Sequence, residues 1–295
     1  MKPVKPIIYV SITTAMILWS FSFIWFKQAN EIFPPFSIVF LRLLISSIIL
    51  VSITLFSGYF RMVSKSDLRW FILLAFFNPF LYFIGESLGL TKVSSTTGAV
   101  IISLIPVLVP FAAWTAFKEK LSILNYTGII TSLLGVLLIV LNKNLNFAAS
   151  PDGIGFMFMA VCSAVIYTIL LKHISGKYHP LYIITFQNLF GAILFLPLFI
   201  YFEWDVFTKL EISIMNLRPI ILLAVFASSL AFILYSYAIR ELGASKTSIF
   251  SNIIPVCTAV LAFIILKETL SLQKVLGIAI VVLGLFLSQA RSSFL

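Results

Sequence analysis

Charged residues are scarce in this sequence. They make up only 10% of the 295 residues, whereas roughly a quarter of the residues in a soluble domain are charged. Apolar residues make up 61% and fall in long runs, and a run of about 20 apolar residues is what a helix needs to cross about 30 Å of hydrocarbon. The scarcity of charge excludes an ordinary soluble domain. The long runs predict an all-α integral membrane protein.

Several signatures of chemistry are also missing. The two cysteines, Cys162 and Cys257, lie inside apolar runs, which excludes a disulfide framework and a cysteine metal cluster. No P-loop, nucleophile elbow, His-Glu-x-x-His motif or pair of intramembrane carboxylates occurs, so we expect neither ATP-driven transport nor an enzyme, and no cofactor or metal. The alternative from a different class is a membrane-embedded lipid-modifying enzyme, which would need clustered acids or histidines near the spans.

Basic residues outnumber acidic ones, 20 against 10, and the formal net charge is +10. They lie between the apolar runs rather than in a basic polar segment, so we expect no nucleic-acid partner. With the N-terminus in the cytoplasm, twelve basic residues fall on the cytoplasmic side and seven on the other, and Arg42 inside a span completes the 20. This bias predicts a multi-pass protein with cytoplasmic N- and C-termini.

Ten apolar runs are long enough to span a bilayer. Several begin at or near a proline, where the missing N–H costs little, and short polar segments separate them. The first run reaches Phe26 and is longer than the apolar part of a signal peptide, so we expect it to be retained. The predicted spans are residues 7–27, 35–57, 68–90, 96–117, 122–141, 152–172, 180–202, 217–238, 247–266 and 271–290.

The second half of the chain repeats the first. Residues 96–138, shifted by 149 positions without a gap, meet identical residues at 13 of 43 positions. A shift of 145 aligns the earlier spans, pairing Lys27 with Lys172 and Pro35 with Pro180. Chance similarity between apolar helices would match leucines and isoleucines, not residues of these kinds. The informative pairs of the first shift are Pro106 with Pro255, Lys118 with Lys267, Glu119 with Glu268, Gly128 with Gly277 and Gly135 with Gly284.

Each repeat holds five predicted spans, residues 1–145 in the first and 146–295 in the second. Because five is odd, the second repeat must cross the membrane in the opposite sense to the first. Inverted repeats of this kind are typical of secondary transporters, whose substrate site lies between the halves near the bilayer midplane. The repeat therefore favours a transporter that works by alternating access, with the lipid bilayer and a small-molecule substrate as partners.

The segment TTGAVIISLIPVLVPFAAWTAFKEKLSILNYTGIITSLLGVLLIVLN and its second copy TSIFSNIIPVCTAVLAFIILKETLSLQKVLGIAIVVLGLFL resemble the hallmark segment of the EamA family in the drug/metabolite transporter superfamily. The resemblance covers essentially the whole chain. It implies a carrier of ten helices in two inverted repeats of five, usually in a bacterial inner membrane. Members of the family commonly export amino acids and other metabolites.

The repeated motif has the chemistry of a scaffold. Ser122 and Ser271 can cap the helix that follows each of them, and Glu119 and Glu268 would place negative charge near its positive end. The glycines of the motif are seven residues apart, two turns along one helix face, which permits close helix approach. Pro106 and Pro255 each remove a helix hydrogen bond within a span, so we expect bends there and regard both as hinge candidates. None of these positions identifies a substrate.

Two charged residues lie well inside predicted spans, Glu86 and Arg42. A charge at the centre of a span costs about 3 kcal/mol on insertion scales, so we expect both side chains to face the protein interior. Their positions within their spans place both in the outer third of the membrane, where they can form an ion pair. The open alternatives are a structural salt bridge and a role for Glu86 as the binding group for a substrate amine or as a proton carrier.

Several polar and aromatic residues complete the candidate site. Asn78, Tyr82 and Glu86 recur every four residues and share one helix face. The two shifts pair Glu86 with Tyr235, Ser103 with Asn252, Arg42 with Gln187 and Ser22 with Tyr167, so the charges of one side have neutral mates on the other. We therefore expect an outer gate stabilised by charge and an inner gate held by hydrogen bonds. The candidate binding or coupling residues are Glu86, Arg42, Tyr82, Asn78, Trp19, Ser22, Tyr167, Tyr235, Asn252 and Gln187.

Together with what the resemblance implies, these residues favour the export of amino acids or related small metabolites from the cell, across its inner (plasma) membrane. The alternative within transport is efflux of cationic or aromatic toxic compounds, which aromatic walls would suit. A phosphorylated or nucleotide-linked substrate would need several interior lysines or arginines, and the spans offer only Arg42 and Lys27. Proton coupling, transport direction and oligomeric state are left open by the sequence.

Overall fold

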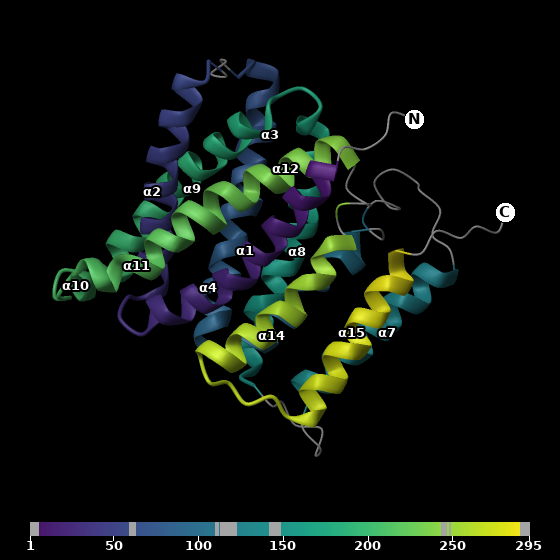
Figure 1. Ribbon diagram of the computed structural model, residues 1–295. Helices are drawn as coiled ribbons and strands as arrows, with labels where there is room; N and C mark the ends of the chain where they lie inside the picture. The colour runs from purple at the N-terminus through teal and green to yellow at the C-terminus, as the bar shows by residue number, and fades with distance from the viewer. Residues whose placement is uncertain are drawn as a thin grey trace.

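The computed structural model describes residues 6–58, 63–109, 112, 123–141, 149–242, 247 and 249–289. Their regular structure is helical (Figure 1). The helices of the first half are α1 Pro6–Asn30, α2 Pro35–Phe56, α3 Lys65–Ala75, η1 Phe76–Leu81, α4 Tyr82–Lys92, α5 Ser95–Ile102 and α7 Ile123–Val140. Those of the second half are α8 Pro151–Ser175, α9 Pro180–Phe202, α10 Trp204–Phe207, α11 Ile214–Leu222, η2 Leu223–Leu230, α12 Ala231–Leu242, η3 Ile249–Asn252, α14 Ile253–Ile265 and α15 Leu272–Gln289.

The expected all-α membrane protein is confirmed, but the count of ten spans is not. Within the described residues, seven helices are long and apolar enough to cross a membrane, taking α3 to α4 and α11 to α12 each as one continuous helix. Three further apolar helices are shorter, at 95–109, 253–265 and 272–287. The predicted fourth span, 96–117, extends beyond the described residues, and the start of the predicted ninth span lies partly outside them.

Two long helices contain a π-helical segment where a single regular span was expected. The segment η1 joins α3 to α4, and inside it Asn78 has non-helical backbone angles, φ −145° and ψ 116°. The segment η2 joins α11 to α12. A shift of 149 places η1 within η2, so both halves of the chain interrupt the same helix at the same place. A π segment leaves main-chain groups without their regular helical partners, which allows other side chains to bind them.

Helices at corresponding positions in the two halves pack against each other. The helix α2 lies along α9, α5 contacts α14, and α7 runs beside α15 at the edge of the bundle (Figure 1). Two crossed contacts are also equivalent: α4 packs on α8, and α1 packs on α12. Each half therefore completes the interior of the other.

Glycines allow the backbones of α7 and α15 to touch. A Cβ atom on Gly135 would lie 2.9 Å from the carbonyl oxygen of Gly277, and one on Gly277 would lie 3.1 Å from the carbonyl oxygen of Gly135. A Cβ on Gly284 would meet the backbone amide of Ser132. The predicted close approach at these glycines is confirmed.

The expected bends lie just before the two prolines. In the first half α5 ends at Ile102, a turn follows at Ser103 and Leu104, and helical structure resumes at 105–109 with Pro106 in its first turn. In the second half the 3-10 turn η3 precedes α14, whose third residue is Pro255. Both breaks follow from the missing N–H of proline.

The capping prediction for the second Lys-Glu motif is half right. Ser271 does cap α15, because its Oγ accepts a hydrogen bond from the Lys274 amide at 3.3 Å. Glu268 binds a different helix from the one expected. Its carboxylate accepts hydrogen bonds from the Ser95 and Thr96 amides at the start of α5, in the other half. The equivalent residues of the first motif, Lys118, Glu119 and Ser122, lie outside the described residues.

The contact between α7 and α15 yields a test of stability. We expect Gly284→Ala to lower the stability of the purified protein by about 1–3 kcal/mol, because the new methyl group meets the backbone of α7 with nothing flexible to move aside. Thermal unfolding in detergent measures it.

Gly155→Ala on α8 is the matched control, since a Cβ there has no atom within 4 Å. The alanine should be neutral or stabilising in that exposed helix position. Equal effects of the two substitutions would contradict the close contact.

Candidate functional site

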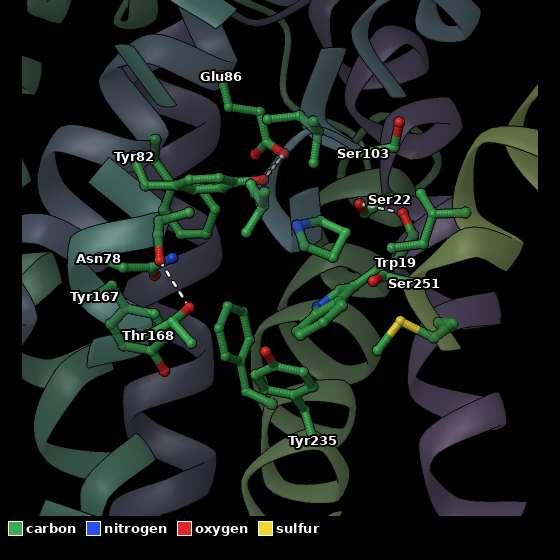
Figure 2. A pocket seen from close by; sticks show the side chains of 18 of the residues that line it. Trp19, Ser22, Asn78, Tyr82, Glu86, Ser103, Tyr167, Thr168, Tyr235 and Ser251 are labelled. Atoms are coloured by element: carbon green, nitrogen blue, oxygen red, sulfur yellow. Dashed lines mark hydrogen bonds between the residues drawn. The ribbon is translucent and has the colours of Figure 1, made fainter. Parts of the chain in front are cut away.

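A cavity lies between the two halves, with an empty volume of about 930 Å³ including solvent at its mouth. Its walls come from α1, the η1–α4 segment, α5 with residues 105–109, α8, α12 and the start of α14, and Arg42 reaches it from α2. Figure 2 shows Glu86 and Tyr82 at one end of this space and Tyr235 at the other.

Arg42 and Glu86 form a buried charged group at one end of the cavity. Their exposed fractions are 3% and 7%, and Arg42 Nη1 lies 3.9 Å from Glu86 Oε2. The Tyr82 hydroxyl donates to Glu86 Oε1 at 2.8 Å. Arg42 Nε donates to Ser228 Oγ at 2.9 Å, and the guanidinium lies 4.3 Å from the centre of the Phe83 ring. The ion pair is thus long, and each charge has a second polar partner that holds it in place.

Aromatic side chains form the opposite end. The Trp19 ring lies 5.0 Å from that of Phe232 and 4.9 Å from that of Tyr235, measured between ring centres. The Trp19 indole N–H donates to the carbonyl oxygen of Ala227 in η2 at 3.3 Å. A hydrogen bond and two ring contacts therefore hold the Trp19 side chain in place. Hydroxyl groups from Ser22, Thr168 and other lining residues add neutral polar atoms to these walls. Large apolar rings with a few polar groups are the usual lining of a small-molecule site.

The cavity brings together nine of the twelve predicted site residues: Trp19, Ser22, Arg42, Asn78, Tyr82, Glu86, Pro106, Tyr167 and Tyr235. Two others do not line it: Gln187 lies behind the wall, and Pro255 is buried in α14 next to the lining residue Ile254. The twelfth residue, Asn252, has a side chain outside the described part of the chain. Among the described residues, no three His, Cys, Asp or Glu side chains gather as a metal site would require.

Gln187 connects two walls of the cavity rather than facing it. Its Nε2 donates to the main-chain oxygen of Asn78 at 2.8 Å, and its Oε1 accepts from the Tyr167 hydroxyl at 3.3 Å. Arg42, its mate in the first half, donates to a side chain of η2, the Ser228 hydroxyl. The residues at this aligned position of α2 and α9 therefore each bind the π segment of the other half. We assign Gln187 a positioning role.

The sequence did not single out several lining residues. Thr168 follows Tyr167, Phe83 follows Tyr82, and Ser251 precedes Asn252, so each adjoins a predicted residue. Ser228, the partner of Arg42, gave no signal because a serine in an apolar span is common, and only the π segment makes it a ligand of the guanidinium. The signal that could have found the first three is their position next to a predicted site residue.

The whole chain matches the model of the EamA-like transporter family, once over residues 6–141 and again over 152–289. Fold and cavity are those of a multi-pass membrane transporter, and the chain belongs to this family. Its relatives include the uncharacterized transporter YetK of Bacillus subtilis, 29% identical over 95% of this chain and 86% of that protein. An uncharacterized transporter of Archaeoglobus fulgidus is 25% identical over 95% of this chain and 97% of its own length.

A solved crystal structure shows the same fold. It superposes with a TM-score of 0.71 over 96% of this chain and 96% of its own, with 16% sequence identity. At that identity the likeness concerns the fold alone. A WAT1-related chloroplastic protein of Arabidopsis thaliana is 23% identical over 91% of this chain and 66% of its own length. These relatives are named as transporters or by family, which agrees with a transporter rather than an enzyme.

The positioning role of Gln187 is testable by stability. We expect Gln187→Leu to cost about 1–3 kcal/mol, because the buried Asn78 carbonyl and Tyr167 hydroxyl both lose a partner. Thermal unfolding of the purified protein gives the value.

Gln28→Leu on α1 is the matched control, because Gln28 is only half-buried. Its effect should stay within about 0.5 kcal/mol, as for a surface substitution. If both variants unfold like the parent, Gln187 does not hold the wall.

Proposed function

We propose that this protein is a secondary transporter that exports amino acids or related small metabolites by alternating access between two inverted repeats. The observation that carries the proposal is the cavity between the halves, which places one buried cation and one buried anion beside aromatic walls. Transport requires a site reachable in turn from both faces, and a site built by both halves meets that need.

Ten spans in two inverted sets of five are part of this proposal. The three short apolar helices stand at the expected places of the fourth, ninth and tenth spans. The pairings α2 with α9, α5 with α14 and α7 with α15, together with the crossed pairs, are those that a twofold axis in the membrane plane would produce. The same axis accounts for the π segments η1 and η2 at equivalent positions.

The balance of charge in the cavity favours a zwitterion. Glu86 suits a substrate ammonium group, and Arg42 suits a carboxylate. Their mutual contact is long at 3.9 Å, so a substrate that supplies both charges can come between them without leaving either buried charge unpaired. Trp19, Phe232 and Tyr235 would then receive the apolar part of the substrate.

Efflux of cationic or aromatic toxic compounds is the second candidate. The aromatic end of the cavity favours it, because aromatic faces attract organic cations. Against it, Arg42 neutralises Glu86, the one carboxylate among the described lining residues. A lipid-modifying enzyme has no support in the family assignment.

The proposed setting is the inner or plasma membrane, with both termini in the cytoplasm, in keeping with the distribution of basic residues. The N-termini of α2 and α5 then lie at the outer face. The proposed partners are the bilayer and a small-molecule substrate, and protons if Glu86 carries them; nucleic acid is not among them.

Uptake into proteoliposomes tests the function. We expect labelled amino acids to enter vesicles that contain the purified protein, and Glu86→Gln to reduce the initial rate roughly tenfold or more, because a charged hydrogen bond to the substrate is lost. The exposed Asp205→Asn is the control for a lost carboxylate outside the cavity, and its rate should equal that of the parent.

An imposed pH gradient separates two roles of Glu86. If Glu86 carries protons, the gradient accelerates uptake by the parent and loses its effect in Glu86→Gln. Uptake that ignores the gradient in both proteins makes this a facilitator. No uptake across the amino-acid panel contradicts the leading substrate class, and organic cations would be assayed next.

A further inference from the structure

We propose that Glu203 and Glu268 latch one face of the protein closed, and that both carboxylates must leave their partners before the cavity can open there. The inference rests on the proposed function, since a latch has meaning only if access alternates. The face concerned is the one at which α2 and α5 begin, called the latch face below.

Glu203 follows the last residue of α9 and is 7% exposed. Its Oε1 accepts from the Phe36 amide at 3.0 Å, and its Oε2 accepts from the Ser37 amide at 2.5 Å and the Ser37 hydroxyl at 2.7 Å. These donors are in the first turn of α2, where the first amides have no partner within the helix and the helix dipole favours negative charge. A side chain of the second half therefore caps a helix of the first.

Glu268 repeats this arrangement on the next pair of helices. From the segment after α14, its Oε1 accepts from the Ser95 amide at 2.7 Å and its Oε2 accepts from the Thr96 hydroxyl at 2.8 Å. Lys27 near the end of α1 adds a favourable Coulombic interaction with this carboxylate. Hydrogen bonds to an ionised carboxylate are roughly twice as strong as neutral ones. The two caps thus join the halves. Separation of the halves at this face would break the hydrogen bonds of both carboxylates.

A sealed apolar layer lies between the latches and the cavity. This layer consists of apolar side chains that are at most 2% exposed: Phe26, Phe33, Ile38, Leu90 and Ala99. Buried apolar side chains therefore separate the cavity from the latch face.

The opposite face lacks the counterpart of one latch. A shift of 145 aligns Glu203 with Gly58, which has no side chain to reach α9. The start of α9 is capped from its own half instead, by Nδ1 of His179, which accepts from the Leu181 amide at 3.3 Å. The buried Glu203 cap thus favours closure of the latch face, and the aligned residue Gly58 offers no such cap at the other.

Each face also has one ion pair that joins the two halves. Lys92 and Asp152 are 3.5 Å apart at the latch face, and Asp67 and Lys177 are 3.0 Å apart at the other. Both lysines are more than 40% exposed, so water and salt screen these pairs. Asp67 also accepts from the Tyr178 hydroxyl at 3.0 Å, but unlike Glu203 it does not cap a helix of the other half.

Thiol labelling from each face tests the latches. The reporter is Ser22→Cys in the cavity, in a background with Cys162→Ala and Cys257→Ala, reconstituted in vesicles of known orientation. A membrane-impermeant thiosulfonate reagent is added to one face at a time. We expect slow labelling from the latch face in the parent. Glu203→Gln and Glu268→Gln should each raise that rate roughly tenfold, as expected for loss of a charged hydrogen-bond set, and the double variant should raise it further.

Two further variants keep the test decisive. Thr96→Val nearly preserves shape and removes only one hydrogen bond to Glu268, so it should raise labelling from the latch face by a few-fold even if the glutamine variants fold poorly. Asp205→Asn, an exposed carboxylate two residues from Glu203, should leave the rate unchanged.

The ratio of labelling rates from the two faces decides the outcome. A ratio that stays constant while the variants lose thermal stability would show that the carboxylates only maintain the fold, and the latch proposal would be overturned. Because labelling uses no substrate, a shifted ratio supports the latches even where no amino acid is transported. Transport with an unshifted ratio refutes the latches and leaves the proposed function standing.

Discussion

The satisfaction of main-chain groups inside the bilayer is the constraint on which this structure depends. Hydrocarbon offers no partner for a carbonyl oxygen that leaves its helix, yet η1 and η2 disrupt the regular hydrogen bonding of two long helices at the level of the cavity. Side chains of the opposite half bind the exposed oxygens: Gln187 binds Asn78, and Trp19 binds Ala227. The irregular backbone is therefore tolerated only because the halves are joined, and the cavity forms where they join.

The same constraint explains how two ionised groups persist in the interior. Arg42 has Ser228 as a hydrogen-bond partner from η2, and Glu86 has Tyr82 from its own helix. Removal of either charge would leave the other buried with a partial shell of dipoles, and a buried unpaired charge costs several kcal/mol. A substrate that offers complementary charges can replace the contact between them. Structural pairing and substrate binding are therefore compatible roles for this pair.

Sequence reasoning was sound where the signal lies within one helix or one repeat. The shift of 149 residues identified Gly135, Gly277 and Gly284 as contact positions, and the rarity of buried charge identified Arg42 and Glu86. It failed where the partner comes from the other half of the chain. Nothing local distinguishes Gln187 as a positioning residue, and the motif suggested for Glu268 a helix adjacent in sequence, whereas the nearer amides in space belong to α5. Contacts across the halves depend on the packing of all the helices, which a pattern within one repeat does not encode.

Differences between the repeats carry as much meaning as their likeness. If the halves were identical, exchanging their conformations would give a state of equal energy, open to the opposite face. The side chains break this equality: Arg42 stands where the second half has Gln187, and Glu203 stands where the first has Gly58. In the proposed alternating access, each substitution adds a charged contact to one conformation and not to its mirror. The preferred resting state of a duplicated fold would then come from a few unmatched charges.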